Sequence, residues 1–304
     1  MSERDWIHKY IRPLTVNVRG ADDLRDDVAL LQTSAGTIVT MDTLVEGQHF
    51  FSSDPLKTVG QKLVRVNVSD IHAKGAVPKE ALLSIAWPKG RRETEFADLM
   101  AGIKLDLKAF GVDLLGGDTV LTEGPLVLTL SLTGVCLGDG PVRRAAQAPD
   151  GATLWLSGPI GGGILGLRAV IEDGDERDVH RYRCPPTTKL MHAKAVAEAG
   201  LAAIDVSDGL LLDALTLAEI NGRGVHINLE RVWLYKATSD LPLIMEQATG
   251  GDDYQILMIA KDGVKIDPEA FLQIGHIKSR PGLTLSFHDE PIPLPDKLGF
   301  DHET

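Results

Sequence analysis

Cysteine is rare in this sequence: Cys136 and Cys184 are the only two among 304 residues, and they form no CxxC pair. This scarcity excludes a disulfide framework and gives no zinc site, and it predicts a protein of the reducing cytoplasm. The first ten residues, MSERDWIHKY, are charged and contain no apolar segment. We therefore expect no secretory signal.

Aromatic and basic residues are also scarce. Aromatic residues make up 5% of the chain, which disfavours a stacking surface for single-stranded nucleic acid. Lys and Arg number 31 against 43 Asp and Glu, the net charge is -12, and no basic stripe is present. We therefore predict no nucleic-acid partner. An acidic protein can still bind a polyphosphate if divalent cations lie between the two sets of negative charges.

Long apolar runs are absent as well. The longest uncharged stretch, Gly151–Leu167, is interrupted by Ser157, Pro159 and several glycines. It is too short and too broken to span a membrane, so we predict no membrane contact. What remains is an ordinary globular composition, 43% hydrophobic, in a chain long enough for two domains.

Residue periodicity predicts an α/β protein with mixed sheets. The first half is expected to run β-β-α-β-α-β-β, and its clearest element is an amphipathic helix, Glu93–Phe110, ended by Gly111. The segment Val64–Val68 alternates like a strand, yet a helix beginning after Pro55 would include it, and periodicity leaves both open. The polar segment Gly138–Pro149 predicts a boundary between domains 1–140 and 141–304. In the second domain, Glu172–Pro186 is expected to be a charged loop.

Acidic residues flank apolar runs at five places along the chain. Ligands bind at the carboxyl ends of strands in open α/β sheets, and Mg²⁺ prefers oxygen ligands, so this repetition favours a carboxylate-lined crevice that holds cations. The alternative for any single acid is a loop or helix cap, as for Asp208. The acids are Asp26 and Asp27 before VALL, Asp42 after Thr37–Met41, Asp70 after VRVNVS, Asp118 after VDLLGG, and Asp205 and Asp208 in AAIDVSDG.

Other candidate features are ambiguous. Gly161, Gly163 and Gly166 form a GxGxxG pattern that could bind phosphate, but the segment EDGDERDVHRYR offers no second strand and no Walker lysine is present. We therefore favour a tightly packed turn over a dinucleotide site. Arg144, next to Arg143, could face a polyphosphate or solvent, and the lone His49 could be packed or functional.

A series of segments resembles the thiamine-monophosphate kinase family, within the aminoimidazole-ribonucleotide synthetase-like superfamily of ATP-binding proteins. The resemblance extends from about Asp26 to His302 and favours the helical interpretation of Val64–Val68. The segments are DDVALL, TMDTLVEGQHF, KLVRVNVSDIHAKGAVP, LLGGDTV, AIDVSDGLLLD and GGDDYQIL, in that order.

The resemblance implies ATP-dependent phosphorylation of thiamine monophosphate to thiamine diphosphate by direct in-line transfer, with several Mg²⁺ ions and ATP as co-substrate. A phosphate monoester is already nucleophilic at neutral pH, so no general base is expected. The implied metal ligands are Asp27, Thr40, Asp42, Asp70, Asp118, Asp205 and Asp208; the implied ATP contacts are Gly117, Asp118, Arg144 and Ser207; and the implied substrate contacts are His49, Asp252 and Phe300.

The resemblance also implies a homodimer. The N-terminal domain would contribute to a barrel-like interface, and the C-terminal domain would close over nucleotide and substrate. Met41 departs from the family pattern by replacing a residue with a hydroxyl, which would remove one metal contact, and Asp252 stands where Glu is usual. The alternatives are another ATP-dependent enzyme of the superfamily, of the selenophosphate, aminoimidazole-ribonucleotide or hydrogenase-maturation type, or a non-catalytic nucleotide-binding regulator.

Overall fold

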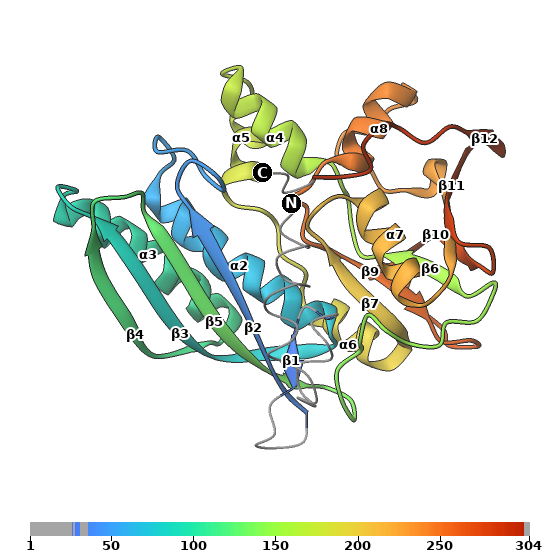
Figure 1. The fold of residues 1–304 in the computed structure, drawn as a ribbon, viewed down its shortest axis with the longest axis horizontal. Coiled ribbons are helices and arrows are strands. Elements are labelled where there is room, and N and C mark those ends of the chain that lie inside the picture. The colour runs from blue at the N-terminus through green and yellow to red at the C-terminus, as the bar shows by residue number, and fades with distance from the viewer. Residues whose placement is uncertain (1–25, 27, 31–35, 301–304) are drawn as a thin grey trace.

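The computed structural model describes residues 26, 28–30 and 36–300, which form two mixed β-sheets with helices packed on them (Figure 1). The expected mixed α/β class is thus confirmed. A helix predicted at Asp5–Arg12 and the candidate ligand Asp27 lie outside the described residues. None of the helices in this part of the chain is both long enough and apolar enough to cross a membrane.

The first sheet has five strands in the order β1-β2-β5-β3-β4, and only β3 and β4 run parallel. Helices α2 and α3 cover one face of it (Figure 1), and the predicted order β-β-α-β-α-β-β is correct. The elements are β1 (Ala29–Leu30), β2 (Thr37–Val45), α2 (Leu56–Ala73), β3 (Ala76–Pro88), α3 (Glu93–Phe110), β4 (Asp113–Thr122) and β5 (Val127–Cys136).

Helix α2 lies at the centre of the molecule, between the first sheet, α3 and the second sheet (Figure 1). Most of its residues are buried, and they include polar ones such as Gln61, Lys62 and Asn67, so no solvent-exposed face marks it as a helix in sequence. This explains why Val64–Val68 alternates like a strand. Two glycines bring α2 against α3: a Cβ on Gly60 would lie 2.4 Å from the Leu99 carbonyl oxygen, and one on Gly102 would lie 1.9 Å from that of Lys57.

The second sheet has seven strands in the order β12-β11-β8-β10-β6-β9-β7. Helix α7 and the neighbouring α8 pack an apolar core on one face, while α6 packs against β7 and β9. Its elements are β6 (Thr153–Leu156), α4 (Gly162–Ile171), α5 (Glu176–Arg183), α6 (Leu190–Ala199), β7 (Gly200–Val206), α7 (Leu210–Ile220), β8 (Gly224–Asn228), α8 (Leu241–Thr249), β9 (Gln255–Ala260), β10 (Leu272–Lys278), β11 (Gly282–Phe287) and β12 (Glu290–Ile292).

The structure corrects three expectations from the sequence. The charged segment expected to be a loop contains α5, whose first turn is capped by Asp175 accepting the N–H of Arg177 at 2.8 Å. Strand β4 continues through Asp118 instead of ending there, and Asp42 lies in the middle of β2. Among the described candidate acids, the rule that places ligand-binding acids at strand ends therefore applies to Asp205, near the end of β7, and to Asp208, just beyond it.

Candidate active site

Strand β2 points its acid toward helix α2. Thr40 and Asp42 share the inner face of the strand, where the Thr40 hydroxyl donates to Asp70 Oδ2 at 2.5 Å and the Asp42 backbone N–H donates to Asn67 Oδ1 at 3.2 Å. Met41 points to the opposite face and is 64% exposed. The missing hydroxyl at position 41 therefore removes no ligand from this group of acids.

Helix α2 also reaches the second sheet. The Ser69 hydroxyl donates to Asp205 Oδ2 at 2.8 Å, and both residues are buried. At the end of the same helix, the buried Lys74 ammonium donates to the Ala203 carbonyl oxygen at 2.7 Å and lies 3.0 Å from Asp26 Oδ1. One helix thus joins carboxylates from β2, α2 and β7.

These three carboxylates, Asp42, Asp70 and Asp205, form the acidic cluster of the site. Burial and the negative charge of Asp205 raise the pKa of Asp42 to about 6. Burial, with Asp42 and Asp205, raises the pKa of Asp70 well above its usual range, and burial raises the pKa of Asp205. The local cations therefore do not balance the negative charge of the acidic cluster. Bound metal ions would neutralise this excess charge.

Arg144 is the main cationic side chain facing the second half of the site. Burial lowers the pKa of its guanidinium, and the opposing charges of Asp205, Asp26, Asp213 and Asp208 act to raise it. Arg144 is partly buried and its charge interacts with these acids, which favours a site-facing side chain over a solvated one. A hollow of about 320 Å³ begins at the next residue and is lined by Ala145, Ala146, Gln147, Ile220 and Asn221.

Several candidates converge just beyond the end of β7. The backbone N–H of Asp252 donates to the Ser207 carbonyl oxygen, and that of Phe300 to the Asp208 carbonyl oxygen, both at 2.8 Å. Asp208 does not cap α7, because the residue at the N-cap is Gly209. Asp213, inside the helix, accepts the N–H groups of Asp208 and Gly209, both at 3.1 Å. Sequence reasoning missed Asp213; its place one turn into the helix after DGLLL was the available signal.

His49 and Asp252 meet through a lysine that the sequence analysis did not single out. The Lys62 ammonium lies 3.1 Å from the His49 carbonyl oxygen and 2.7 Å from Asp252 Oδ2. The His49 ring accepts the Val45 backbone N–H on Nδ1 at 3.0 Å, which assigns its proton to Nε2. No local sequence signal could find this group, because its members are distant in the chain.

Gly117 and Asp118 do not join the acidic cluster within one chain. Strands β5 and β3 separate β4 from β2, a distance of about 14 Å at ordinary strand spacing. Asp118 is aligned with Ser84, Thr129 and Thr43 across the outer face of the sheet, opposite to Asp42. Gly117 has a packing role, since a Cβ there would lie 1.7 Å from the Leu83 carbonyl oxygen.

The glycine-rich segment at the start of α4 is a packing feature, as favoured from sequence. A Cβ on Gly163 would lie 2.2 Å from the Gly251 carbonyl oxygen. The Asp253 carboxylate accepts the N–H of Gly161 at 2.6 Å and that of Gly163 at 3.1 Å. An internal carboxylate therefore occupies the position where a dinucleotide phosphate would bind.

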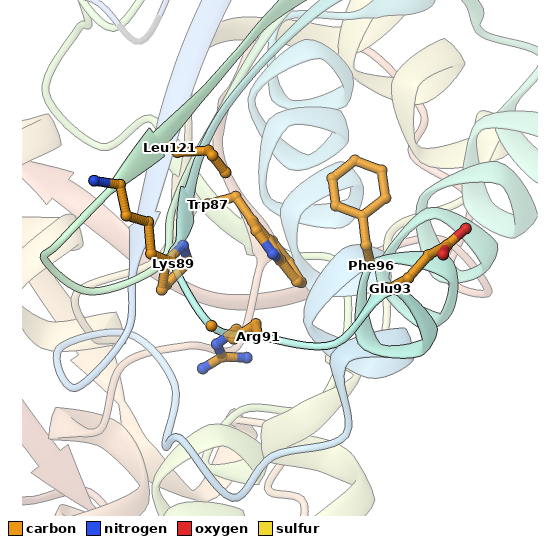
Figure 2. Close-up of a pocket in the computed structure, with 8 residues that line it drawn as sticks. Trp87, Lys89, Arg91, Glu93, Phe96 and Leu121 are labelled. Atoms are coloured by element: carbon orange, nitrogen blue, oxygen red, sulfur yellow. The ribbon is translucent and has the colours of Figure 1, made fainter.

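A second hollow, of about 410 Å³, lies at the end of β3 (Figure 2). The Trp87 and Phe96 rings meet edge to face in its wall, with centroids 5.1 Å apart. Arg91 at its edge pairs with Glu46, whose other oxygen accepts the Leu126 N–H at 3.1 Å. Glu46 thus anchors the loop that carries His49, and the lining contains none of the candidate residues.

The donor chemistry of the site fits magnesium. The acidic cluster supplies hard carboxylate oxygens with unbalanced charge, and the hydroxyls of Thr40 and Ser69 orient two of the carboxylates. Among the described residues, no three His, Cys, Asp or Glu side chains are arranged to chelate one ion by themselves. This arrangement suits Mg²⁺, which is usually held by few carboxylates together with waters and substrate phosphates.

Comparison with known proteins identifies the family of this chain. Residues 25–138 match the family model of the AIR synthase related protein, N-terminal domain. The chain is 35% identical to a thiamine-monophosphate kinase of Caulobacter vibrioides, over 99% of this chain and 91% of the relative, and 32% identical to that of Bacillus subtilis, over 84% and 82%. A solved structure of AaThiL complexed with AMPPCP and TMP superposes with a TM-score of 0.84 at 25% identity, over 99% of this chain and 97% of the other. This chain therefore belongs to the thiamine-monophosphate kinase family.

Proposed function

We propose that this protein transfers the γ-phosphoryl group of ATP directly to the phosphate of thiamine monophosphate, giving ADP and thiamine diphosphate. The observation that carries the proposal is the Ser69–Asp205 hydrogen bond of 2.8 Å, which joins the acids of the first sheet to those of the second. Family membership supplies the substrate class, since the relatives are named for this reaction. The neighbouring structure, complexed with AMPPCP and TMP, supports the same pair of ligands.

The acidic cluster would hold the magnesium ions, with Thr40 and Asp208 as further oxygen donors. Asp27 keeps its proposed place as a ligand from the sequence resemblance alone. When bound, the ions would neutralise the charge that spreads over the γ-phosphate oxygens. Thr40 and Ser69 hold the carboxylates of Asp70 and Asp205 by hydrogen bonds, so these oxygens are preorganised before substrate arrives.

ATP and thiamine monophosphate would contact different residues beside the acidic cluster. Arg144 and Ser207, beside the end of β7, would contact ATP. His49, with its proton on Nε2, can donate to a phosphate oxygen of thiamine monophosphate, and Asp252 and Phe300 complete that side. No side chain needs to act as a base, because the attacking phosphate oxygen is already ionised.

Asp118 and Gly117 lead us to infer a homodimer. Both lie on β4, away from the acidic cluster of their own chain, and Asp118 is on an exposed face that also carries Met41 and Leu82. A second copy packed on this face would extend the sheet surface into a barrel-like interface and would bring Asp118 and Gly117 to the partner's ATP. In this arrangement residues 1–140 bind metal and dimerise, and residues 141–304 close over the ligands.

A direct assay tests the function. The purified protein is incubated with ATP, Mg²⁺ and thiamine monophosphate, and thiamine diphosphate is measured by mass spectrometry. We expect one thiamine diphosphate per ADP. ADP formation that does not respond to thiamine monophosphate would contradict the proposal and favour another enzyme of the superfamily. We expect the protein to work in the cytoplasm, and its two free cysteines, Cys136 and Cys184, agree with a reducing compartment.

A further inference from the structure

Lys62 is a buried cation that the phosphoryl-transfer chemistry does not use. It lies in α2, and its side chain is 3% exposed. Its ammonium contacts the His49 carbonyl oxygen at 3.1 Å and Asp252 Oδ2 at 2.7 Å, and it lies 4.6 Å from the centroid of the Tyr182 ring. A buried ammonium is stable only when such partners replace water, so this geometry is specific.

The turn that carries Asp252 is strained and tightly fixed. Asp252 and Tyr254 have φ values of 66° and 51°, in the left-handed region that non-glycine residues rarely occupy. The Tyr254 hydroxyl donates to Asp252 Oδ1 at 2.7 Å, while Lys62 occupies Oδ2. Burial alone would raise the pKa of Asp252, but Lys62 and Tyr254 lower it below its usual value, so the carboxylate is ionised. Strain of this kind persists only where surrounding contacts enforce it.

The loop that carries His49 has its own anchors besides Lys62. Arg183 of α5 pairs with the buried Asp54 carboxylate at 2.7 Å, and the Phe51 and Tyr182 rings lie 5.9 Å apart. These contacts hold the loop in place without setting its distance from the Asp252 turn. The Tyr182 hydroxyl also donates to the His49 carbonyl oxygen, at 3.5 Å, and Lys62 joins that oxygen directly to the Asp252 carboxylate.

We propose that Lys62 is a positioning residue that sets the spacing between His49 and Asp252 and thereby the affinity for thiamine monophosphate. This inference rests on the proposed function. Lys62 acts through its two partners and need not touch the substrate. Because ATP would bind beside Arg144 and Ser207, the effect should be confined to the acceptor.

The test compares Lys62→Met with Lys62→Arg. We expect Lys62→Met to raise the KM for thiamine monophosphate about tenfold, the effect of losing one hydrogen bond to a charged group, with the KM for ATP within about twofold of wild type. Equilibrium binding of thiamine monophosphate without ATP, by calorimetry, should weaken by the same factor. Lys62→Arg keeps the charge but moves the hydrogen-bond donors, so its KM for thiamine monophosphate should lie between those of the wild type and Lys62→Met.

Arg65→Met is the matched control. Arg65 lies one turn further along α2, where it pairs with Asp106 at 2.5 Å and donates to the Pro185 carbonyl oxygen at 2.9 Å, away from His49 and Asp252. It should lower the melting temperature and leave both KM values unchanged. Equal rises in KM for the two substrates in Lys62→Met, or the same rise in Arg65→Met, would show only general packing and overturn the inference.

Three further outcomes are decisive. If Lys62→Met does not fold, Lys62→Arg decides: a KM for thiamine monophosphate equal to wild type overturns the positioning role, and a selective rise supports it. If the wild-type protein forms no thiamine diphosphate, the proposed function fails, and the calorimetric affinity still reports whether Lys62 shapes the site. An active wild type with unchanged binding in Lys62→Met would overturn this inference alone.

Discussion

The two faces of the five-stranded sheet carry different kinds of residues. On the inner face, Thr40 and Asp42 point at α2 and join a partly buried group of acids whose pKa values are raised. On the outer face, Met41 and Leu82 are 64% and 52% exposed, and Asp118 lies among them. Alternation along a strand separates these two sets completely, so neighbouring residues in one motif can serve different sites. We propose that the inner face serves the chain's own active site and that the outer face binds a second copy.

The largest effect is expected on the inner face. Asp42→Asn or Asp70→Asn should reduce kcat by at least about 10²-fold, because each removes a charge that would hold a cation against the transferred phosphoryl group. The same changes relieve crowding among buried carboxylates, so the metal-free melting temperature should not fall. Steady-state kinetics and thermal melting check both, and near-wild-type turnover in either variant would refute the acidic cluster as the metal site.

The second prediction concerns Asp118, on the outer face of the sheet. Asp118→Asn should also lose most activity, although Asp118 lies on the face opposite the acidic cluster. If it serves the partner's site, co-expression of Asp42→Asn with Asp118→Asn chains should restore up to about a quarter of wild-type activity, because half of randomly mixed dimers have one intact site. Each variant alone provides the control. Failure of the purified mixed dimer to regain activity would show that Asp118 acts in its own chain or not at all.

The third prediction concerns the outer face as an interface. Leu82→Asp places a charge on the exposed outer face and should shift the protein from dimer to monomer, with a loss of activity that grows on dilution. Leu105→Asp, at a similarly exposed leucine on α3, is the control and should remain dimeric. Light scattering at several concentrations measures the mass. A wild-type monomer at micromolar concentration would contradict the inferred dimer.

Much of the fold could be predicted from sequence because its periodic elements are conventional. The helix Glu93–Phe110 has a polar face and a glycine at its end, and its predicted bounds are those observed. Helix α2 is ambiguous for a physical reason, since it is buried on nearly every side and its buried residues include both polar and apolar side chains. Helix α5 was missed because most of its residues are charged, and its few buried residues, such as Tyr182, do not form an apolar run.

The residues of the candidate site likewise divide into those that the sequence reveals and those that it does not. Asp42, Asp70 and Asp205 could be found because the acids stand out beside apolar runs, although only Asp205 does so for the expected reason of lying near a strand end. Lys62 could not be identified from sequence, whereas Asp213 had a signal in its place one turn into the helix after DGLLL. A lysine inside a buried helix acquires a role only when a partner distant in the chain lies beside it, as Asp252 does for Lys62.

The smallest effect is expected at Met41, and its contrast with Thr40 tests the separation of the two faces. Met41→Thr restores the hydroxyl that the family pattern has at this position, but on the outer face, so kcat should stay within about twofold and stability within about 0.5 kcal/mol. Thr40→Val, at the adjacent position, removes the hydroxyl that orients Asp70 and should lower kcat about tenfold. Kinetics at matched magnesium concentrations compare the pair. A large gain from Met41→Thr would mean that the outer face supplies a metal ligand, and the division between the faces would then be wrong.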